Sequence, residues 1–186
     1  MDSLYALLVE ASSCEACGLC DTRNVVVFGD GNDKADVMFV GEAPGEQEDE
    51  TGIPFVGRSG QLLSNMLDHC LGLTRDDVYI ANIVKCRPPE NRDPTPEEIT
   101  ACLGFLKQQI KIIQPKVIVT LGRVATQSLL ETKERIGKLR GKQFTYEGIP
   151  LVPSWHPSYL LRRQTAKLDT VEDMKIVTEI LAQTQS

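Results

Sequence analysis

The sequence has few histidine and aromatic residues and no long apolar run. Its 186 residues include two histidines and one tryptophan, and aromatic side chains make up 5% of the chain. No apolar stretch approaches the length needed to cross a bilayer, and the start, MDSLYALLVEASSC, lacks the basic segment of an export signal. We therefore expect no membrane association and a cytoplasmic location.

Several signatures of repeat proteins and nucleotide-binding proteins are also missing. The chain has no internal repeat, low-complexity tract or obvious linker, so we expect one domain over residues 1–186. No Lys-Ser or Lys-Thr pair follows GEAPG (41–45), and GDG (29–31) precedes an expected strand rather than a helix, which excludes the usual phosphate-binding loops. The net charge of −6 argues weakly against a nucleic-acid partner, although residues 133–142 are rich in lysine and arginine.

Four apolar, β-branched runs alternate with stretches of helical periodicity. This pattern predicts an α/β fold: a three-layer sandwich with a central, mainly parallel four-stranded sheet flanked by helices. A hairpin is expected around YEGI (146–149), and Pro96 and Pro115 should bound a long helix. The four expected strands are residues 36–41, 78–84, 116–122 and 149–155.

Polar residues follow the ends of these strands. Ligands of open α/β sheets bind beyond the carboxyl ends of the strands, so Glu42, Asn82 and His156 are expected to meet at one edge. Taken singly, each has a structural alternative: GEAPG as a tight turn, and His156 as a histidine satisfied within the fold. The convergence of the three is the functional signal.

The six cysteines favour metal or redox chemistry over disulfides in a cytoplasmic chain. Cys14 and Cys17 form a C-x2-C pair, Cys20 follows closely, and 15 residues separate Cys86 from Cys102. Cys70 stands alone and is interpreted as a small core residue.

Three motifs, in this order and spacing, resemble the family 4 uracil-DNA glycosylases, the iron–sulfur branch of that superfamily. They are GEAPGEQED (41–49), PFVGRSGQLL (54–63) and HPSYLLR (156–162), and the resemblance runs from Cys14 to about Arg163. It implies a DNA repair enzyme that flips uracil out of single- or double-stranded DNA and hydrolyses its bond to the sugar, leaving an abasic site. We expect this enzyme to act as a monomer.

The resemblance also implies roles for individual residues. Asn82 would read the uracil edge, His156 would stabilise the departing base, and Glu42 would steady the sugar cation or orient the attacking water. Phe55 would stack on the base, and Gly41, Glu42, Ala43 and Asp49 would lie near it.

Contacts to DNA are expected from two further regions. Leu161, or its neighbour Leu160, would act as an apolar wedge, and Arg162 would contact a phosphate or fill the vacated space. A short amphipathic helical turn is the structural alternative for the two leucines. Further phosphate contacts are expected from Lys85, Arg87, Arg92 and residues 133–142.

In the resembled family, four cysteines arranged like Cys14, Cys17, Cys86 and Cys102 hold a [4Fe–4S] cluster. Zinc suits four thiolates equally well, and the sequence alone leaves that alternative open. The N-terminal part of the domain would then be an iron–sulfur segment with a structural role.

Two other functions remain as alternatives. One is a non-catalytic, nucleic-acid-binding redox sensor, which would not need Glu42, Asn82 and His156 together. The other is a glycosylase for a different deaminated base, such as hypoxanthine. A related class that cross-links itself to the abasic sugar needs an extra histidine in a basic insertion, and the chain has only His69 and His156.

Overall fold

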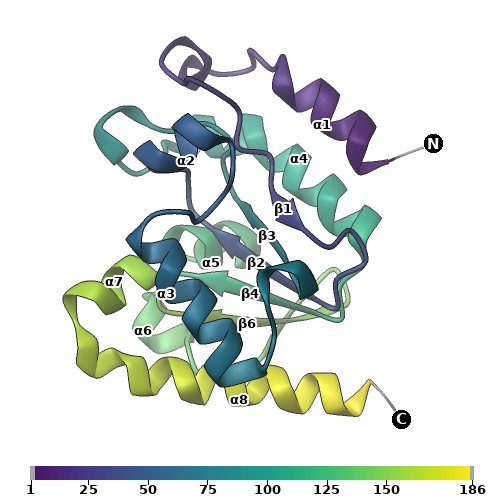
Figure 1. The fold of residues 1–186 in the computed structure, drawn as a ribbon, viewed down its shortest axis with the longest axis vertical. Helices are drawn as coiled ribbons and strands as arrows, with labels where there is room; N and C mark the ends of the chain where they lie inside the picture. The colour runs from purple at the N-terminus through teal and green to yellow at the C-terminus, as the bar shows by residue number, and fades with distance from the viewer. Residues whose placement is uncertain (1–2, 185–186) are drawn as a thin grey trace.

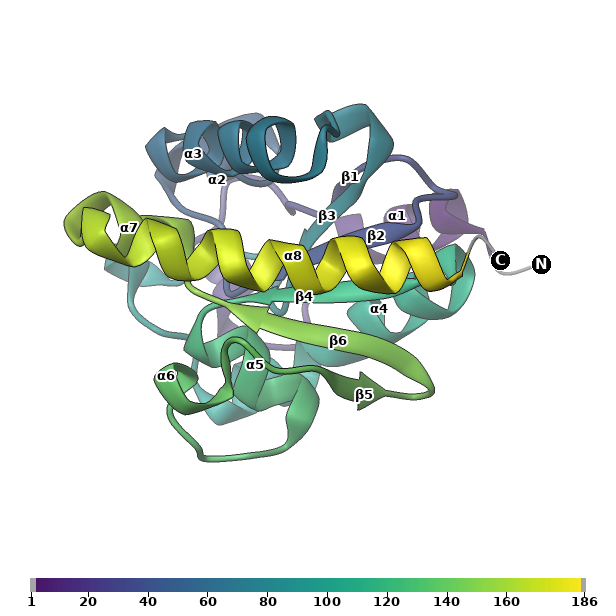
Figure 2. The ribbon, with the colours of Figure 1, turned by 90° about the horizontal axis from the view of Figure 1, so that it is seen from below.

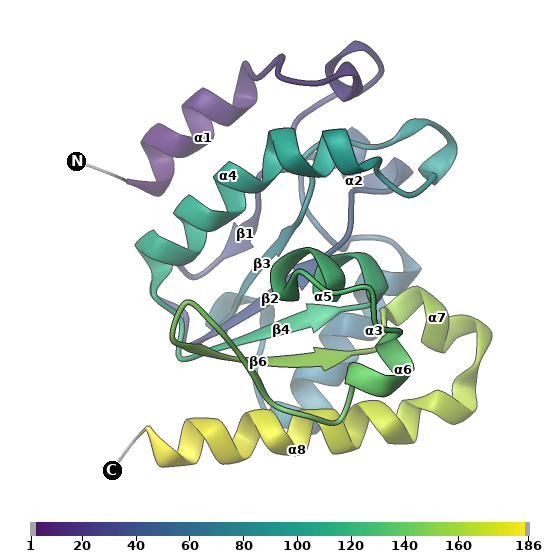
Figure 3. The ribbon, with the colours of Figure 1, turned by 180° about the vertical axis from the view of Figure 1, so that it is seen from behind.

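The structure, a computed structural model that describes residues 3–184, contains one six-stranded sheet between two layers of helices. Figure 1 shows α3 in front of the sheet and α8 running below β6, and Figure 3, seen from behind, shows α4 and α5 on the opposite face. Among the described residues no helix is both long and apolar enough to span a membrane. The elements are α1 (Leu4–Ser12), η1 (Gly18–Asp21), β1 (Asp30–Gly31), β2 (Val37–Gly41), α2 (Glu46–Thr51), α3 (Arg58–Met66), η2 (Leu67–Leu71), η3 (Arg75–Asp77), β3 (Tyr79–Asn82), η4 (Pro89–Asn91), α4 (Pro96–Ile113), β4 (Val117–Leu121), α5 (Arg123–Leu130), α6 (Ile136–Leu139), β5 (Phe144–Tyr146), β6 (Ile149–Ser154), α7 (Pro157–Arg162), η5 (Gln164–Ala166) and α8 (Lys167–Gln183).

The strand order is β1-β3-β2-β4-β6-β5, and β3, β2, β4 and β6 run parallel. This confirms the predicted mainly parallel α/β sandwich, with its four parallel strands at the centre. The expectation of four strands in all was too low, because β1 and β5 add antiparallel edges. β1 is only two residues long and carries no apolar run, so it left no pattern to detect.

The parallel strands are apolar on both faces because helices cover both. Met38 and Val40 of β2 pack in the core beneath α4 and α5, whereas Val37 and Phe39 pack beneath α3 and α8. Figure 2 shows α8 running along one side of the sheet and α5 lying on the other. Burial on two sides explains why these strands read as continuous apolar runs.

The expected hairpin and helix boundaries are also confirmed. β5 and β6 are joined by Glu147 and Gly148, both with positive φ, the backbone geometry of a tight hairpin turn. Thr95 and Glu98 form a capping box at the start of α4, and Gln114, in the left-handed conformation, ends that helix before Pro115. α1 packs on α4 through Leu7 and Ala11, which carries the cysteine segment to that side of the molecule.

Candidate active site

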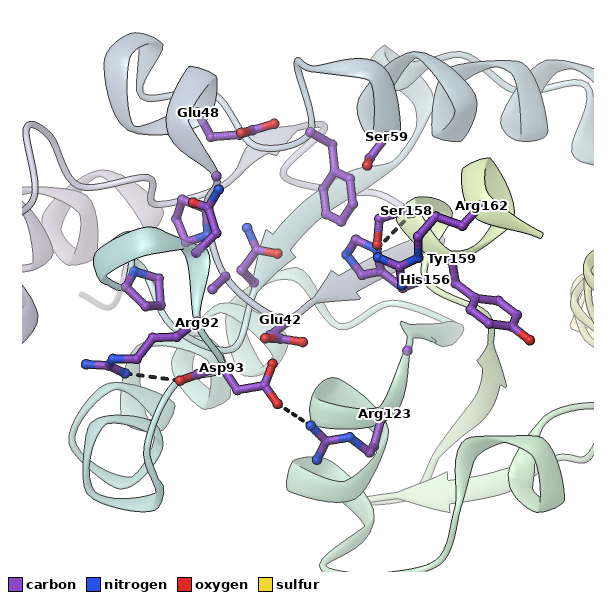
Figure 4. A pocket seen from close by; sticks show the side chains of 18 residues that line it. Glu42, Glu48, Ser59, Arg92, Asp93, Arg123, His156, Ser158, Tyr159 and Arg162 are labelled. Carbon is purple, nitrogen blue, oxygen red and sulfur yellow. Dashed lines mark hydrogen bonds and ion pairs between the residues drawn. The ribbon is translucent and has the colours of Figure 1, made fainter. Parts of the chain in front are cut away.

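A cavity of about 480 Å³ lies where β2, β3, β4 and β6 end. The ends of parallel strands meet at one edge of a sheet, so four distant chain segments contribute side chains to it (Figure 4). Its lining residues are Glu42, Ala43, Pro44, Gly45, Glu48, Phe55, Ser59, Asn82, Pro88, Asn91, Arg92, Asp93, Gly122, Arg123, His156, Ser158, Tyr159 and Arg162. Glu42, Asn82 and His156 therefore meet, as the strand pattern predicts.

Asn82 is the last residue of β3 and is only 2% exposed. Its Oδ1 atom is buried without a hydrogen-bond partner among the described residues. Lys85 holds the main chain in place, because its Nζ donates to the Asn82 carbonyl oxygen at 2.9 Å. Leaving a buried polar atom unsatisfied is costly, so this carboxamide is prepared for a ligand.

Phe55 is held beside Asn82 by a hydrogen-bonded loop. It has a left-handed backbone (φ +53°), and Arg75 donates to the Phe55 and Pro54 carbonyl oxygens at 2.8 and 2.6 Å. A Cβ atom on Gly41 would lie 2.5 Å from Phe55 Cζ and 2.4 Å from Asn82 Oδ1. Gly41 thus lies directly against both residues, and only glycine leaves room for them.

His156 follows β6 and caps α7. Its Nδ1 accepts from the Ser158 main-chain N–H at 3.0 Å and lies 2.7 Å from Ser158 Oγ. Burial, followed by the nearby charge of Arg162, lowers the His156 pKa to about 4. The ring is therefore neutral near pH 7, with Nδ1 accepting and the proton on Nε2. The rings of His156 and Phe55 lie 5.6 Å apart.

Glu42 follows β2 and shares the cavity with two charged residues from other elements. Burial, and then the neighbouring carboxylate of Asp93, raise the pKa of Glu42 to about 7, while Arg123 opposes them. Asp93 precedes α4 and forms an ion pair with Arg123 of α5. A carboxyl that titrates near neutral pH suits proton transfer.

The resemblance places Asp49 of α2 near the base, but Glu48 is the acid of that helix that lines the cavity. Asp49 lies outside the cavity, 1% exposed, and accepts from the main-chain and side-chain nitrogens of Asn24 at 2.9 and 2.7 Å. Glu48 lines the cavity instead, and its Oε1 accepts from the N–H groups of Val56 and Gly57. To choose between the adjacent residues Glu48 and Asp49, one must know which face of the short helix α2 is turned to the cavity. The motif alone does not give this. Ala43 lines the cavity as expected.

The segment after His156 forms α7, with its leucines on different surfaces. Leu160 is 1% exposed in the core and unavailable as a wedge, whereas Leu161 is half-exposed. Arg162 is exposed and lines the mouth of the cavity. Leu161 and Arg162 are thus accessible on α7, and the helical turn expected as the structural alternative for the leucines is also present.

Lys85, expected to contact a phosphate, is buried instead, and one residue of the basic stretch 133–142 is engaged within the protein. Lys85 is 1% exposed, and its Nζ is used by Asn82 and by Gln109 Oε1 at 2.6 Å. Arg140, within the basic stretch 133–142, is paired with the buried carboxylate of Asp173 at 2.6 Å.

The four cysteines of the predicted cluster line a second, small hollow. Cys14 and Cys17 come from the segment after α1, Cys86 from the loop after β3, and Cys102 from α4. Arg23 donates to the Cys14 carbonyl oxygen at 2.7 Å and contacts Cys86 Sγ at 3.5 Å. Cysteine sulfur atoms are the donors that hold iron–sulfur clusters, so the chemistry of these four residues fits such a cluster.

The remaining cysteines lie elsewhere. Cys20 does not line the hollow and its Sγ contacts Asp21 Oδ1 at 3.6 Å, while Cys70 packs at the edge of the core beneath α3 and α8. None of the six is in a disulfide. Among residues 3–184, no three His, Cys, Asp or Glu side chains are placed to share a single metal ion.

The relatives found by comparison with known proteins and the matching family model agree on one family. The chain is 46% identical to the Type-4 uracil-DNA glycosylase of Sulfurisphaera tokodaii, over 97% of the chain and 86% of that protein. It is 51% identical to the Type-4 enzyme of Thermotoga maritima (83% and 81% covered) and 42% identical to that of Archaeoglobus fulgidus (100% and 96%). A family model, described as the Uracil DNA glycosylase superfamily, matches residues 28–181, and the chain belongs to this family.

Proposed function

We propose that the protein is a uracil-DNA glycosylase that hydrolyses the bond between uracil and deoxyribose and leaves an abasic site. The observation that carries this proposal is the buried, unpartnered Oδ1 of Asn82 in a cavity shared with Phe55 and His156. The names of the Type-4 relatives support the same activity.

Asn82 provides the base recognition. Uracil presents an N3–H donor beside the O4 acceptor, and the carboxamide offers the complementary pair: Oδ1 accepts from N3–H and Nδ2 donates to O4. Cytosine presents a bare N3 and an amino group, so it would leave both groups of the carboxamide unpaired. A buried site built to form hydrogen bonds rejects such an analogue strongly. Phe55 supplies an apolar face on which the base stacks.

His156 and Glu42 act on the bond that breaks. Cleavage leaves negative charge on the departing uracil and positive charge on the sugar. The neutral His156 ring would donate from Nε2 to uracil O2, and an ionised Glu42 would stabilise the sugar cation and orient water. Both groups are in place before the reaction, so little reorganisation is needed.

The DNA would be held around the flipped nucleotide. We propose that Leu161 enters the gap in the stack and that Arg162 contacts the backbone, because both are accessible on α7 beside the cavity. We propose action on single- and double-stranded DNA, by a cytoplasmic monomer of one domain.

We further propose that Cys14, Cys17, Cys86 and Cys102 hold a [4Fe–4S] cluster. The first two lie in the N-terminal segment, outside the matched residues 28–181, so the cluster would join that segment to the loop after β3 and to α4. When bound, it supplies a structural cross-link. Asn82, in β3, and the cluster loop are neighbours in sequence, and this connects the two sites.

The test is release of free uracil from single- and double-stranded oligonucleotides without added cofactor or divalent metal, followed by strand breakage in alkali. His156→Ala serves as the inactive variant, and hypoxanthine-containing oligonucleotides test the other base. Binding without base release from any substrate would instead support the redox sensor.

A further inference from the structure

Two carboxyl groups from different elements face each other in the cavity. Figure 4 shows the side chains of Glu42 and Asp93 pointing toward one another, and both residues line the cavity. Two carboxylates that face each other repel when both are ionised, so the pair binds one proton more readily than an isolated carboxylate does. Such a pair is built to take up a single proton.

The position of Asp93 is fixed from two sides. Its carboxylate pairs with Arg123 of α5. Its main-chain oxygen accepts from Arg92 Nη1 at 3.0 Å, and the Arg92 guanidinium is bound by both carboxylate oxygens of Glu98 at 2.9 and 2.7 Å. Glu98 in turn belongs to the capping box of α4. The loop that carries Asp93 is therefore anchored to the start of a long helix.

Building on the proposed role of Glu42, we propose that Asp93 is a positioning residue for hydrolysis: it acts through Glu42 to receive the proton of the attacking water, with Arg123 balancing its charge. The two carboxylates are both ionised before the reaction. After the transfer, the proton lies between them.

The step balances in atoms and electrons. The bond between the sugar C1′ and uracil N1 breaks, and its electron pair leaves with the base. The water oxygen forms the new bond to C1′, and the proton that it loses passes to Glu42 and is shared with Asp93. The pair later returns that proton to solvent or to the uracil anion.

Charges around Glu42 predict how the reaction depends on pH. Asp93 raises the Glu42 pKa and Arg123 lowers it, while Arg92, Glu48 and His156 line the same cavity from other elements. A pKa near 7 makes Glu42 a stronger proton acceptor than an ordinary carboxylate. Activity should therefore rise with pH as Glu42 ionises.

The experiment is single-turnover uracil release from about pH 5 to about pH 9, with saturating enzyme, for wild type, Asp93→Asn, Arg123→Gln and Glu42→Gln. The acid limb is the part of the profile in which the rate rises with pH, and the plateau is the constant rate above it. Asp93→Asn should move the acid limb to lower pH, by about one unit, and lower the plateau rate. Arg123→Gln should move it to higher pH. Asp36→Asn, which removes an exposed ion pair with Lys116 outside the cavity, is the control and should leave the profile unchanged. Carboxyl NMR of Glu42 in the DNA-free variants gives a readout independent of turnover.

The outcomes separate the two proposals. If Glu42→Gln retains both full activity and the acid limb, the proposed role of Glu42 fails. If Glu42→Gln abolishes the limb but Asp93→Asn and Arg123→Gln leave it in place, or move it in the same direction, only the inference about Asp93 fails. If Asp93→Asn lowers the rate of uracil release equally at every pH and leaves the acid limb of the profile unmoved, Asp93 has only a structural role.

Discussion

The Lys85 ammonium donates a hydrogen bond of 2.9 Å to the main-chain carbonyl of Asn82, the residue proposed to read the base. The same ammonium is bound by Gln109 of α4, whose amide donates to the Phe28 carbonyl at 2.8 Å. The main-chain N–H of Lys85 meets Cys102 Sγ at 3.3 Å. One buried lysine thus joins the base pocket, a long helix and the cysteine hollow.

Lys85→Met should destabilise the protein. The apolar side chain fits the buried space but leaves the Asn82 carbonyl and Gln109 Oε1 without their donor, which costs about 1–3 kcal/mol of unfolding free energy. Urea denaturation followed by circular dichroism measures this loss. Lys116→Met, which removes an exposed ion pair, is the matched control and should cost less than about 1 kcal/mol. Equal effects in the two variants would contradict the role given to Lys85.

Asn82→Ala should lower kcat/KM for uracil release about 100-fold, or roughly 3 kcal/mol, because the hydrogen bonds to the base edge are lost. The affinity for abasic DNA should change little, since the backbone contacts remain. Asn65→Ala, which removes an exposed amide on α3, provides the control. Normal turnover by Asn82→Ala would show that another group reads the base.

The His156 ring should remain neutral down to about pH 4, where its lowered pKa lies. Imidazole NMR can follow it readily, because His69 is the only other histidine. In the unfolded chain the ring takes up its proton at the ordinary pKa of 6.5, so the stability that the neutral ring contributes is present above that value and is lost as the pH falls toward 4. A midpoint at 6.5 in the folded protein would contradict the lowered pKa of His156.

If the proposed [4Fe–4S] cluster is present, the purified protein is brown, and Cys86→Ser should remove that colour, the bound iron and much of the stability, because one of the four proposed cluster ligands is lost. Cys20→Ser and Cys70→Ser, which lie outside the hollow, should retain all three. Iron and acid-labile sulfide analysis, together with thermal melting, measures the outcome. If the purified wild-type protein contains zinc and no iron, the four cysteines form a zinc site and the proposed iron–sulfur cluster is wrong.

Much of the cavity was predictable because parallel strands end at one edge. Glu42 and His156 follow strongly apolar strands and Asn82 ends one, so the convergence of the three depends only on topology. The position of Phe55 was supplied by family resemblance, since a loop aromatic gives no pattern of its own.

The errors share one physical origin: the direction of a side chain was not fixed by its place in the sequence. Lys85 looks like a surface cation in a loop, yet Gln109, far along the chain, supplies a buried partner. Leu160 and Leu161 are adjacent but separated by the phase of α7, as are Glu48 and Asp49 on α2. Asp93 and Arg123 come together in the cavity only through the packing of α5 beside the loop before α4, which the sequence does not reveal.

The close approach of Gly41 to Asn82 and Phe55 restricts how this pocket can be redesigned. Any larger residue at position 41 would collide with the carboxamide and the ring at once, since both contacts fall below 3.0 Å for a single added carbon. Engineering the enzyme toward bulkier lesions must therefore begin at other residues that line the cavity, such as Glu48 and Tyr159, while Gly41 stays as it is.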